Sequence, residues 1–310
     1  MTVIEYTQAK KGNLLIIGDL LIDKTWFVEA SKLSPEAPVP VVQLTSSGAI
    51  EDPGGAGLAA SFGTKIFTDL NIDFYTATTK EKIIWLNKKG IKTKGTLIDS
   101  DKVIYKTRFI DKNSRYHLIR VDNDNIAKES RLNRDEFTYE LRKYIRKGLN
   151  GIVLLDYKKG IFNDKLLLSY IIEESKRHNI PTYVDSRSND LNKFNGIDYL
   201  KLNKNEFADA CFNLNCLNEK QLIEKLNIKE LLITKGEDGA DLHNLHDVFS
   251  YKATLDEFPG APDVTGCGDA FDISFCYYKM VKRLSSHEAF KYAVDTATEY
   301  AHMPIEERLC

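Results

Sequence analysis

Short apolar segments alternate with segments of helical character, such as residues 164–178, along most of the 310-residue chain. The apolar segments, which we expect to be buried strands, are residues 13–18, 151–157, 181–185, 199–203 and 230–236. Strands that alternate with helices are joined by right-handed crossovers and lie parallel. The chain is therefore predicted to have an α/β fold, with a mostly parallel central sheet and helices on both faces.

Two stretches depart from this alternation. Residues 34–40 (SPEAPVP) are rich in proline, which excludes a helix and favours an extended edge segment. Residues 96–121 alternate polar and apolar side chains about a turn at 112–114, as expected for a β-hairpin. Because no repeat or low-complexity linker sets these stretches apart, we predict one domain over residues 1–310 with lid segments at about 24–47 and 96–121.

The composition excludes several classes of function. Lys and Arg (43) nearly balance Asp and Glu (45), so the chain has no overall positive charge that would favour binding of nucleic acid. No apolar run approaches the ~20 residues that span a bilayer, and the N-terminus lacks the pattern of a signal peptide. The five cysteines lack the spacing of a metal site, so we expect free thiols without disulfides or zinc. These features predict a cytoplasmic location and neither a nucleic-acid nor a membrane partner.

Acidic residues and glycines follow the first predicted strand. Asp19 and Asp23 lie beyond its carboxyl end, where α/β sheets bind ligands, so we expect them to hold substrate hydroxyls. A capped turn is the alternative explanation. Residues 53–60 (PGGAGLAA) then open a helix that is predicted to run to about residue 70. A ligand can approach the backbone most closely where no side chain is present, here at Gly54 and Gly55.

The segment Asp263–Phe271 (DVTGCGDAF) precedes an apolar-periodic stretch that is predicted to be helical. Gly266 and Gly268 leave backbone N–H groups unobstructed at the positive end of that helix, which suits a phosphoryl group. Asp269 falls in the first turn, where a carboxylate can act as a base or serve only as a helix cap.

Two further motifs follow predicted strands. Asn203 and Glu206 could order magnesium-bound waters, although a helix capping box is the simpler explanation of that pair taken alone. The second motif could receive the phosphate or ribose of a nucleotide, and its residues are Thr234, Gly236 and Gly239.

In this order, the three motifs resemble those of the ribokinase-type, or pfkB, family of carbohydrate kinases, and the resemblance extends over nearly the whole chain. It implies a ribokinase-like fold with a small β lid, and ATP and Mg²⁺ as cofactors. It also implies a catalytic Asp269 beside an anion hole formed by Gly266, Cys267 and Gly268. Magnesium would be held through water by Asn203 and Glu206. The nucleotide would be bound by Asn203, Arg187, Thr234, Gly236 and Gly239.

Within that family, the N-terminal half is most similar to the kinases of D-glycero-β-D-manno-heptose 7-phosphate, as in GDLLIDKTWF, LSPEAPVPVV, PGGA, LIRVD and LDYKKG. This similarity implies phosphorylation of that sugar phosphate at O1 by a chain carrying the kinase domain only. Leu58 replaces an Asn of those kinases, and the stretch after Thr76 is shorter than theirs. We also expect the last helix to lack the usual small residues near the adenine. A kinase for another sugar or a nucleoside, or a non-catalytic sugar- or nucleotide-binding protein, is the alternative.

The predicted hairpin carries several cations. Lys106 and Arg108 are two residues apart and therefore project from one face of a strand, and Arg120 lies on the partner strand. Arginine binds phosphate oxygens through paired N–H groups, so we expect these side chains to bind the phosphate of a sugar phosphate. Solvated edge charges are the alternative. The hairpin could also form a homodimer interface through exposed aromatic residues, namely Tyr105, Phe109 and Tyr116.

Overall fold

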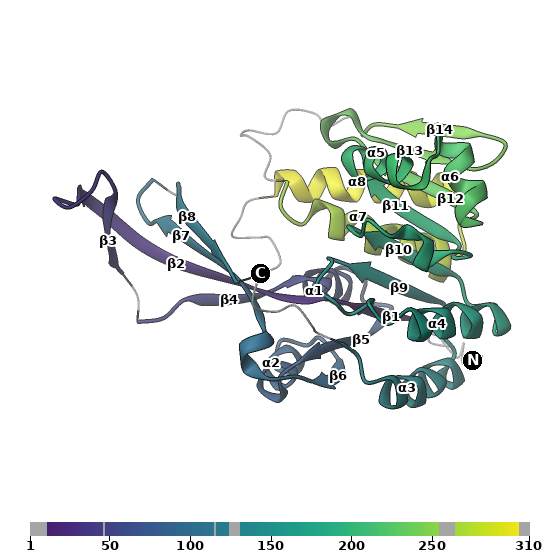
Figure 1. Cartoon of the computed structure of the whole chain (residues 1–310), viewed down its shortest axis with the longest axis horizontal. Coiled ribbons are helices and arrows are strands. Elements are labelled where there is room, and N and C mark those ends of the chain that lie inside the picture. The colour runs from purple at the N-terminus through teal and green to yellow at the C-terminus, as the bar shows by residue number, and fades with distance from the viewer. Residues whose placement is uncertain (1–10, 46, 115, 124–130, 254–263, 304–310) are drawn as a thin grey trace, which may run out of the picture.

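The computed structural model describes residues 11–45, 47–114, 116–123, 131–253 and 264–303. Its largest element is a nine-stranded sheet in the order β14-β13-β12-β11-β10-β9-β1-β5-β6. The strands from β12 to β6 are parallel, whereas β13 and β14 add an antiparallel edge (Figure 1). The strands are β1 (Gly12–Gly18), β5 (Leu70–Thr78), β6 (Thr93–Leu97), β9 (Gly151–Asp156), β10 (Thr182–Ser186), β11 (Tyr199–Asn203), β12 (Glu230–Thr234), β13 (Ala240–His243) and β14 (Val248–Tyr251). The mostly parallel sheet is confirmed.

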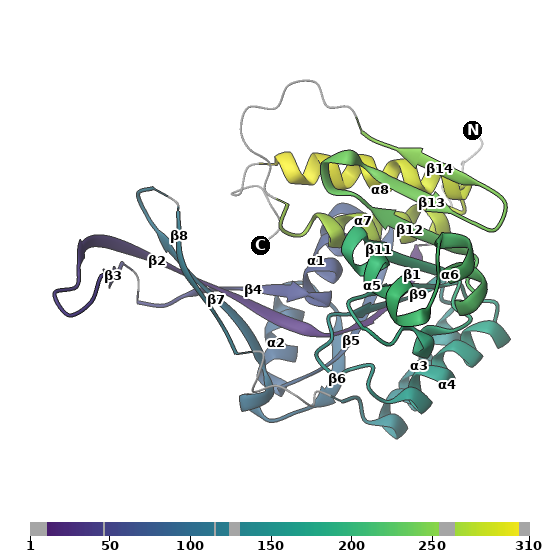
Figure 2. The same ribbon diagram turned by 45° about the horizontal axis from the view of Figure 1, so that its top comes forward.

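Helices cover both faces of this sheet (Figures 1 and 2). Successive side chains of β1 belong to two different cores, with Leu14 and Ile16 in one and Leu15 and Ile17 in the other. One core includes side chains of α1 (Ala56–Ile66), α2 (Lys80–Lys88), α7 (Cys267–Cys276) and α8 (Ser286–His302). The other includes those of α3 (Arg134–Lys147), α4 (Lys165–Arg177), α5 (Lys204–Leu214) and α6 (Glu219–Leu226). The predicted layering is therefore confirmed.

The first helix ends earlier than the sequence suggested. α1 was expected to continue to about residue 70, but it stops at Ile66, and β5 begins at Leu70. The Leu70 amide donates to the Phe67 carbonyl, which turns the chain into the strand. The apolar side chains of Leu70 and Ile72 serve the same core as the helix, so hydrophobic periodicity alone did not mark the boundary.

A second sheet of five strands extends away from the body in both views (Figures 1 and 2). We call this sheet the lid. It consists of β2 (Leu20–Leu33), β3 (Pro40–Leu44), β4 (Ile50–Gly55), β7 (Ile104–Asp111) and β8 (His117–Asp122). On one edge β2 pairs with β3 and β4, and on the other it pairs with β7, which pairs with β8.

The lid confirms the predicted hairpin and changes its limits. The hairpin strands are β7 and β8, whereas residues 96 and 97 belong to β6 of the main sheet. The lid sheet already begins at Leu20, and it includes β4, which the sequence did not reveal because its Asp-Pro-Gly-Gly segment is typical of a turn. One residue, Asp19, separates β1 from β2, so the lid grows directly out of the main sheet.

Candidate active site

The N-terminus of α7 places Asp269 near the carboxyl ends of the central strands. Gly266 precedes the helix with φ +83°, a left-handed conformation that favours glycine. A Cβ at this position would come within 3.0 Å of Leu58 and 3.1 Å of Tyr300. Backbone conformation and close packing thus both require a glycine here. The helix predicted after this motif is confirmed, and Asp263, the first residue of the motif, lies outside the described residues.

The Asp269 carboxylate is partly buried and accepts a hydrogen bond from the Tyr157 hydroxyl. Burial raises the pKa of Asp269 to about 6, an effect opposed by the Tyr157 hydrogen bond and by the charges of Lys201 and Arg187. Asp185 acts in the same direction as burial. A carboxyl group with a pKa near 6 is largely ionised at neutral pH and still able to accept a proton, as a general base requires.

Lys201 is a buried cation directly behind the helix terminus. Its ammonium group lies 2.9 Å from an oxygen of Asp185 and 3.7 Å from an oxygen of Asp272. These carboxylates hold the pKa of Lys201 above its usual value despite burial. A Cβ added at Gly268 would lie 3.4 Å from the ammonium nitrogen, so a full positive charge stands beside the expected anion hole.

Sequence reasoning missed Lys201, although a signal was present. A lysine between two leucines in the strand YLKLN is unusual, because a lysine is almost never fully buried unless it is paired. The partner of Asp272 was missed as well: the Tyr183 hydroxyl donates to Asp272 over 2.7 Å, and burial raises the pKa of Asp272 well above its usual value.

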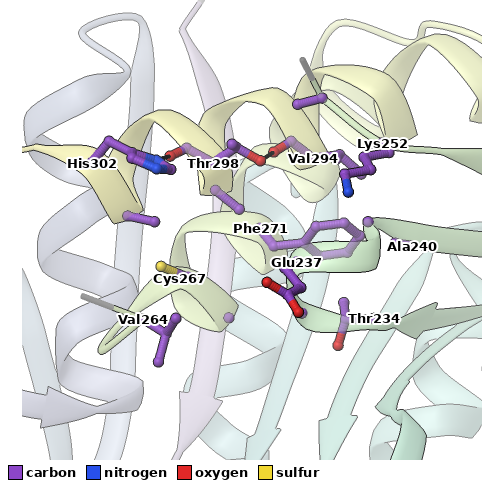
Figure 3. A pocket seen from close by; sticks show the side chains of 16 residues that line it. Thr234, Glu237, Ala240, Lys252, Val264, Cys267, Phe271, Val294, Thr298 and His302 are labelled. Carbon is purple, nitrogen blue, oxygen red and sulfur yellow. Dashed lines mark hydrogen bonds between the residues drawn. The ribbon is translucent and has the colours of Figure 1, made fainter. Parts of the chain in front are cut away.

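A pocket of about 470 Å³ borders the Gly-rich turn and the first residues of α7 (Figure 3). Its lining includes all three residues of the predicted nucleotide motif together with two of the predicted anion hole, namely Thr234, Gly236, Gly239, Cys267 and Gly268. Two motifs that are far apart in the sequence therefore meet at one cavity. Gly236 and Gly239 both have positive φ (+62° and +83°), which explains the glycines in this turn.

The last helix forms one wall of this pocket (Figure 3). Val294 and Thr298 face it, and so do the small residues Ala297 and Ala301. The expectation that this helix lacks small residues at the nucleotide site is therefore wrong. A spacing of four residues puts both alanines on one helical face, and this could have been read from the sequence.

Asn203 and Glu206 form the capping box of α5. The Asn203 side chain accepts from the amides of Asn205 and Glu206, and Glu206 accepts from the Asn203 amide over 2.7 Å. Neither residue lines the 470 Å³ pocket. Burial and the charge of Asp185 raise the pKa of Glu206, so the two carboxylates interact.

The two carboxylates offer oxygen atoms of the kind that divalent cations bind. One oxygen of Asp185 is buried and has no hydrogen-bond partner among the described residues. That oxygen and the Glu206 carboxylate fit a hard cation that takes its other ligands from phosphates and water. No cluster of three or more metal-ligating side chains occurs in the described part of the chain.

Arg187 and Asp19 take different positions relative to the site. The Arg187 guanidinium lies 4.6 Å from the centre of the Tyr157 ring, at the exposed mouth of the site. Asp19 is buried instead, and its two oxygens accept from the amides of Lys159 (3.1 Å) and Ile161 (3.2 Å). Burial and Asp156 raise the pKa of Asp19 to about 7. The structure thus uses Asp19 to anchor the loop after β9.

Asp23 lies on the lid. Its carboxylate pairs with Arg108, and a Cβ added at Gly54 would overlap it. Gly55 has φ +56°, and a side chain there would overlap Leu21. Both glycines therefore allow β4 to pair closely with β2.

The three lid cations share one face, as predicted. Lys106 is paired with Asp122, and Arg108 is directly opposite Arg120. Arg120 is about half exposed and forms an ion pair of 2.5 Å with Asp122. The other face packs toward α2, where the Lys82 ammonium lies 5.5 Å from the centre of the Tyr105 ring.

Comparison with known proteins places this geometry in a family. Residues 52–301 match the pfkB family of carbohydrate kinases. Among curated proteins, the chain is similar to the bifunctional protein HldE of Proteus mirabilis (28% identity over 272 residues, covering 84% of this chain and 54% of that protein). The bifunctional protein HldE of Blochmanniella pennsylvanica is 29% identical over 282 residues, covering 87% and 55%. The chain thus spans about half the length of these relatives.

Solved structures share the fold at low sequence identity. Arabidopsis thaliana ribokinase complexed with ribose and ATP superposes with a TM-score of 0.68 at 14% identity, covering 94% of this chain and 93% of that one. The Y23D mutant of Escherichia coli phosphofructokinase-2 gives 0.69 at 16% identity, covering 97% and 95%. None of the helices in the described residues has the length and apolarity to cross a bilayer. The chain belongs to the pfkB family of carbohydrate kinases, and its fold is the ribokinase-like fold.

Proposed function

We propose that this carbohydrate kinase transfers the γ-phosphoryl group of ATP to O1 of D-glycero-β-D-manno-heptose 7-phosphate. The observation that carries the proposal is the position of Asp269, at the N-terminus of α7 and beside a pocket lined by the nucleotide motif. The heptose assignment is supported by the N-terminal segments that resemble heptose 7-phosphate kinases, and by relatives named HldE.

The chemistry assigns a role to each group around α7. Asp269 accepts the proton of the acceptor hydroxyl, and a general base of this kind contributes ~100- to 10,000-fold. The amides of Gly266, Cys267 and Gly268 face the developing negative charge at the positive end of the helix dipole. Lys201 adds a fixed positive charge behind Gly268, which needs no reorganisation during the reaction.

The nucleotide occupies the pocket between the β12 turn and α8 in this proposal. Thr234, Gly236 and Gly239 contact its ribose and phosphates, and Arg187 contacts a phosphate from the mouth of the site. Asn203 and Glu206, together with Asp185, would hold Mg²⁺, largely through water. When bound, this ion neutralises charge on the phosphates.

The lid supplies the acceptor site. Asp23 holds sugar hydroxyls, and the backbone at Gly54 and Gly55 closes the site from the side of β4. The shared face of Lys106, Arg108 and Arg120 meets the 7-phosphate, because arginine binds phosphate oxygens in a bidentate way. Asp19 supports this site by accepting hydrogen bonds from the amides of Lys159 and Ile161, and its remaining acceptor positions can serve a sugar hydroxyl.

The proposal treats residues 1–310 as one kinase domain, because the lid strand β2 continues from β1 with a single residue between them. We also propose that the protein is located in the cytoplasm, where ATP is available. Association of two lids is a further expectation, since the lid exposes apolar side chains, namely Leu33, Leu44, Tyr116, Ile119 and Val121.

An ADP-release assay over a panel of sugars tests the assignment. The panel contains the heptose 7-phosphate, the unphosphorylated heptose, hexose phosphates, ribose and nucleosides, each with ATP and Mg²⁺. The heptose 7-phosphate is expected to give the highest kcat/KM, and Asp269→Asn is the control for background hydrolysis. Preference for another acceptor would replace the heptose assignment. Leu58 beside Gly266 is the observation that favours such a second candidate, because its side chain cannot hydrogen-bond a hydroxyl.

A further inference from the structure

Tyr157 is a buried residue immediately after β9 whose hydroxyl donates to Oδ1 of Asp269. None of the three motifs contains it, and it does not line the 470 Å³ pocket. Within the described residues, Tyr157 is the one hydrogen-bond partner of the Asp269 carboxylate. A buried tyrosine that follows a strand of the sheet thus contacts the candidate base on a helix 112 residues further along the chain.

The backbone around Tyr157 is held in place from both sides. Asp19 accepts from the amides of Lys159 and Ile161, two and four residues further along the chain. Asp156 accepts from the Lys158 amide over 2.9 Å. Lys158 itself has φ +61°, a left-handed conformation that a non-glycine residue adopts only when its surroundings fix it. The loop therefore presents the phenol in one position.

Two buried groups hold Asp156 in turn. The Ser186 hydroxyl donates to it over 3.0 Å, and the Lys193 ammonium lies 2.6 Å from the same carboxylate oxygen. The Lys193–Asp156 pair is almost completely buried. Because β9, β10 and the following turn all contribute to this support, the loop is tied to the rigid sheet.

We propose that Tyr157 is a positioning residue for phosphoryl transfer: it holds Oδ1 of Asp269, so that the second carboxylate oxygen is presented to the acceptor hydroxyl. This inference rests on the proposed role of Asp269 as the base. The proton moves from the acceptor hydroxyl to Oδ2 of Asp269 as the new P–O bond forms and ADP leaves. The tyrosine keeps its own proton throughout, because burial and the neighbouring carboxylates raise the pKa of Tyr157 well above its usual value.

The charges that face Asp269 come from three elements. Lys201 on β11 and Arg187 after β10 favour the ionised carboxylate, whereas Asp185 on β10 and Asp272 on α7 oppose it. The cations and the anions therefore have opposite effects on the pKa of Asp269, and burial raises this pKa. The Tyr157 hydroxyl is the neutral donor of this set, and its loss is expected to raise the pKa of Asp269 above about 6.

The first test needs no substrate. Carboxyl ¹³C resonances of aspartate-labelled protein are followed against pH, and Asp269→Asn identifies the signal of Asp269. We expect its midpoint near pH 6 in the wild type. Tyr157→Phe should move it up by about one pH unit, the size expected for a hydrogen bond to a charged group that is partly replaced by water. An unchanged midpoint in a folded variant overturns the proposal.

A second measurement serves if Tyr157→Phe does not fold. In tyrosine-labelled wild-type protein, the ring ¹³Cζ signal of Tyr157 should follow the ionisation of Asp269, with the same midpoint. This titration should disappear in Asp269→Asn. A Tyr157 signal that does not respond near pH 6 in the wild type contradicts the hydrogen bond and the proposal with it.

The kinetic test uses the pH profile with the heptose 7-phosphate as acceptor. Tyr157→Phe should move the acidic limb of kcat to higher pH and lower kcat about fivefold at pH 6, with a smaller loss at pH 8. An equal loss at every pH overturns the proposal. If this acceptor gives no turnover, the heptose assignment fails, and the carboxyl titration still decides the role of Tyr157.

Tyr183→Phe is the matched control. It removes a hydroxyl that donates to Asp272, a second aspartate on the same helix, over 2.7 Å. The change in chemistry and burial is the same, but Asp272 becomes easier to protonate, which leaves less negative charge near Asp269. The acidic limb should therefore stay in place or move to lower pH. An upward shift equal to that of Tyr157→Phe would mean that the effect is not specific to Tyr157 and would overturn the proposal.

Discussion

The ammonium group of Lys201 lies 2.9 Å from a carboxylate oxygen of Asp185, and both side chains are buried. Asp272 lies on the other side of the same ammonium group, at 3.7 Å. One oxygen of each aspartate is buried without a hydrogen-bond partner among the described residues. Lys201 therefore holds together a buried group of charges at the base of the active site.

Lys201→Met is expected to destabilise the fold strongly at neutral pH. Removing one partner of a buried ion pair costs about 3 to 5 kcal/mol, because the remaining carboxylates lose their compensating charge. Lys201 opposes the effect of burial on the pKa of Asp272, so this folded-state pKa rises further in the variant. Stability is then lost as pH increases, and the deficit is smaller at pH 5 than at pH 8. Urea unfolding at both pH values measures this. An equal deficit at the two pH values would contradict the assignment.

Asp269→Asn should fold and bind ATP while losing ~100- to 10,000-fold of the transfer rate, because the amide cannot accept the proton. The raised pKa of Asp269 means that its ionisation opposes folding as pH rises from about 4 through about 6. The variant should therefore be more stable than the wild type at pH 8, by about 1 to 2 kcal/mol after allowance for solvent screening, and not at pH 4. Turnover near the wild-type rate would reject Asp269 as the base.

Gly268→Val should weaken ATP binding at least ~10-fold, since its side chain enters the space that a phosphate needs beside the backbone. The fold should tolerate the change, because an added Cβ first meets the Lys201 nitrogen at 3.4 Å, an ordinary contact distance. Gly48→Val makes the same change where a Cβ meets nothing within 4 Å, and should leave ATP affinity unaltered. Calorimetry with ATP compares the two variants. Unchanged affinity in Gly268→Val would place the phosphate site elsewhere.

Arg108→Gln should raise KM for the heptose 7-phosphate about tenfold or more and affect the unphosphorylated heptose much less, because a bidentate contact to the phosphate is lost. Glutamine keeps a polar group next to Asp23, which loses its ion pair in this variant. Lys112→Gln serves as the control, since Lys112 lies past the end of β7 and pairs with Glu29. An equal rise in KM for both sugars in Arg108→Gln would show that the lid cations do not bind the 7-phosphate.

The sequence predicted those parts of the molecule that depend on local pattern. Short apolar segments located strands of the main sheet, and alternating polar and apolar residues located the lid hairpin. The glycines of the Gly266 turn marked the start of α7. Asn203 and Glu206 were ambiguous, and the structure shows a capping box, which is a local interaction. A local pattern cannot state whether such a pair also faces a cation.

What the sequence did not predict are side-chain contacts between elements that are distant in the chain. Tyr157 and Asp269 are 112 residues apart, and Lys201 meets Asp272 from a different element. Asp19 is a further example: the sequence did not predict the hydrogen bonds that its carboxylate accepts from the amides of Lys159 and Ile161.

The long lid strand β2 begins next to the residue that holds the loop after Tyr157. β2 runs for 14 residues from the core to the outer end of the lid. Asp19, the residue immediately before β2, accepts two hydrogen bonds from backbone amides of the loop that follows Tyr157. A displacement of Asp19 would break or move its hydrogen bonds to the amides of Lys159 and Ile161, in the loop that follows Tyr157. The lid strand and the carboxylate of Asp269 are therefore connected through Asp19, the loop after β9 and the Tyr157 hydroxyl.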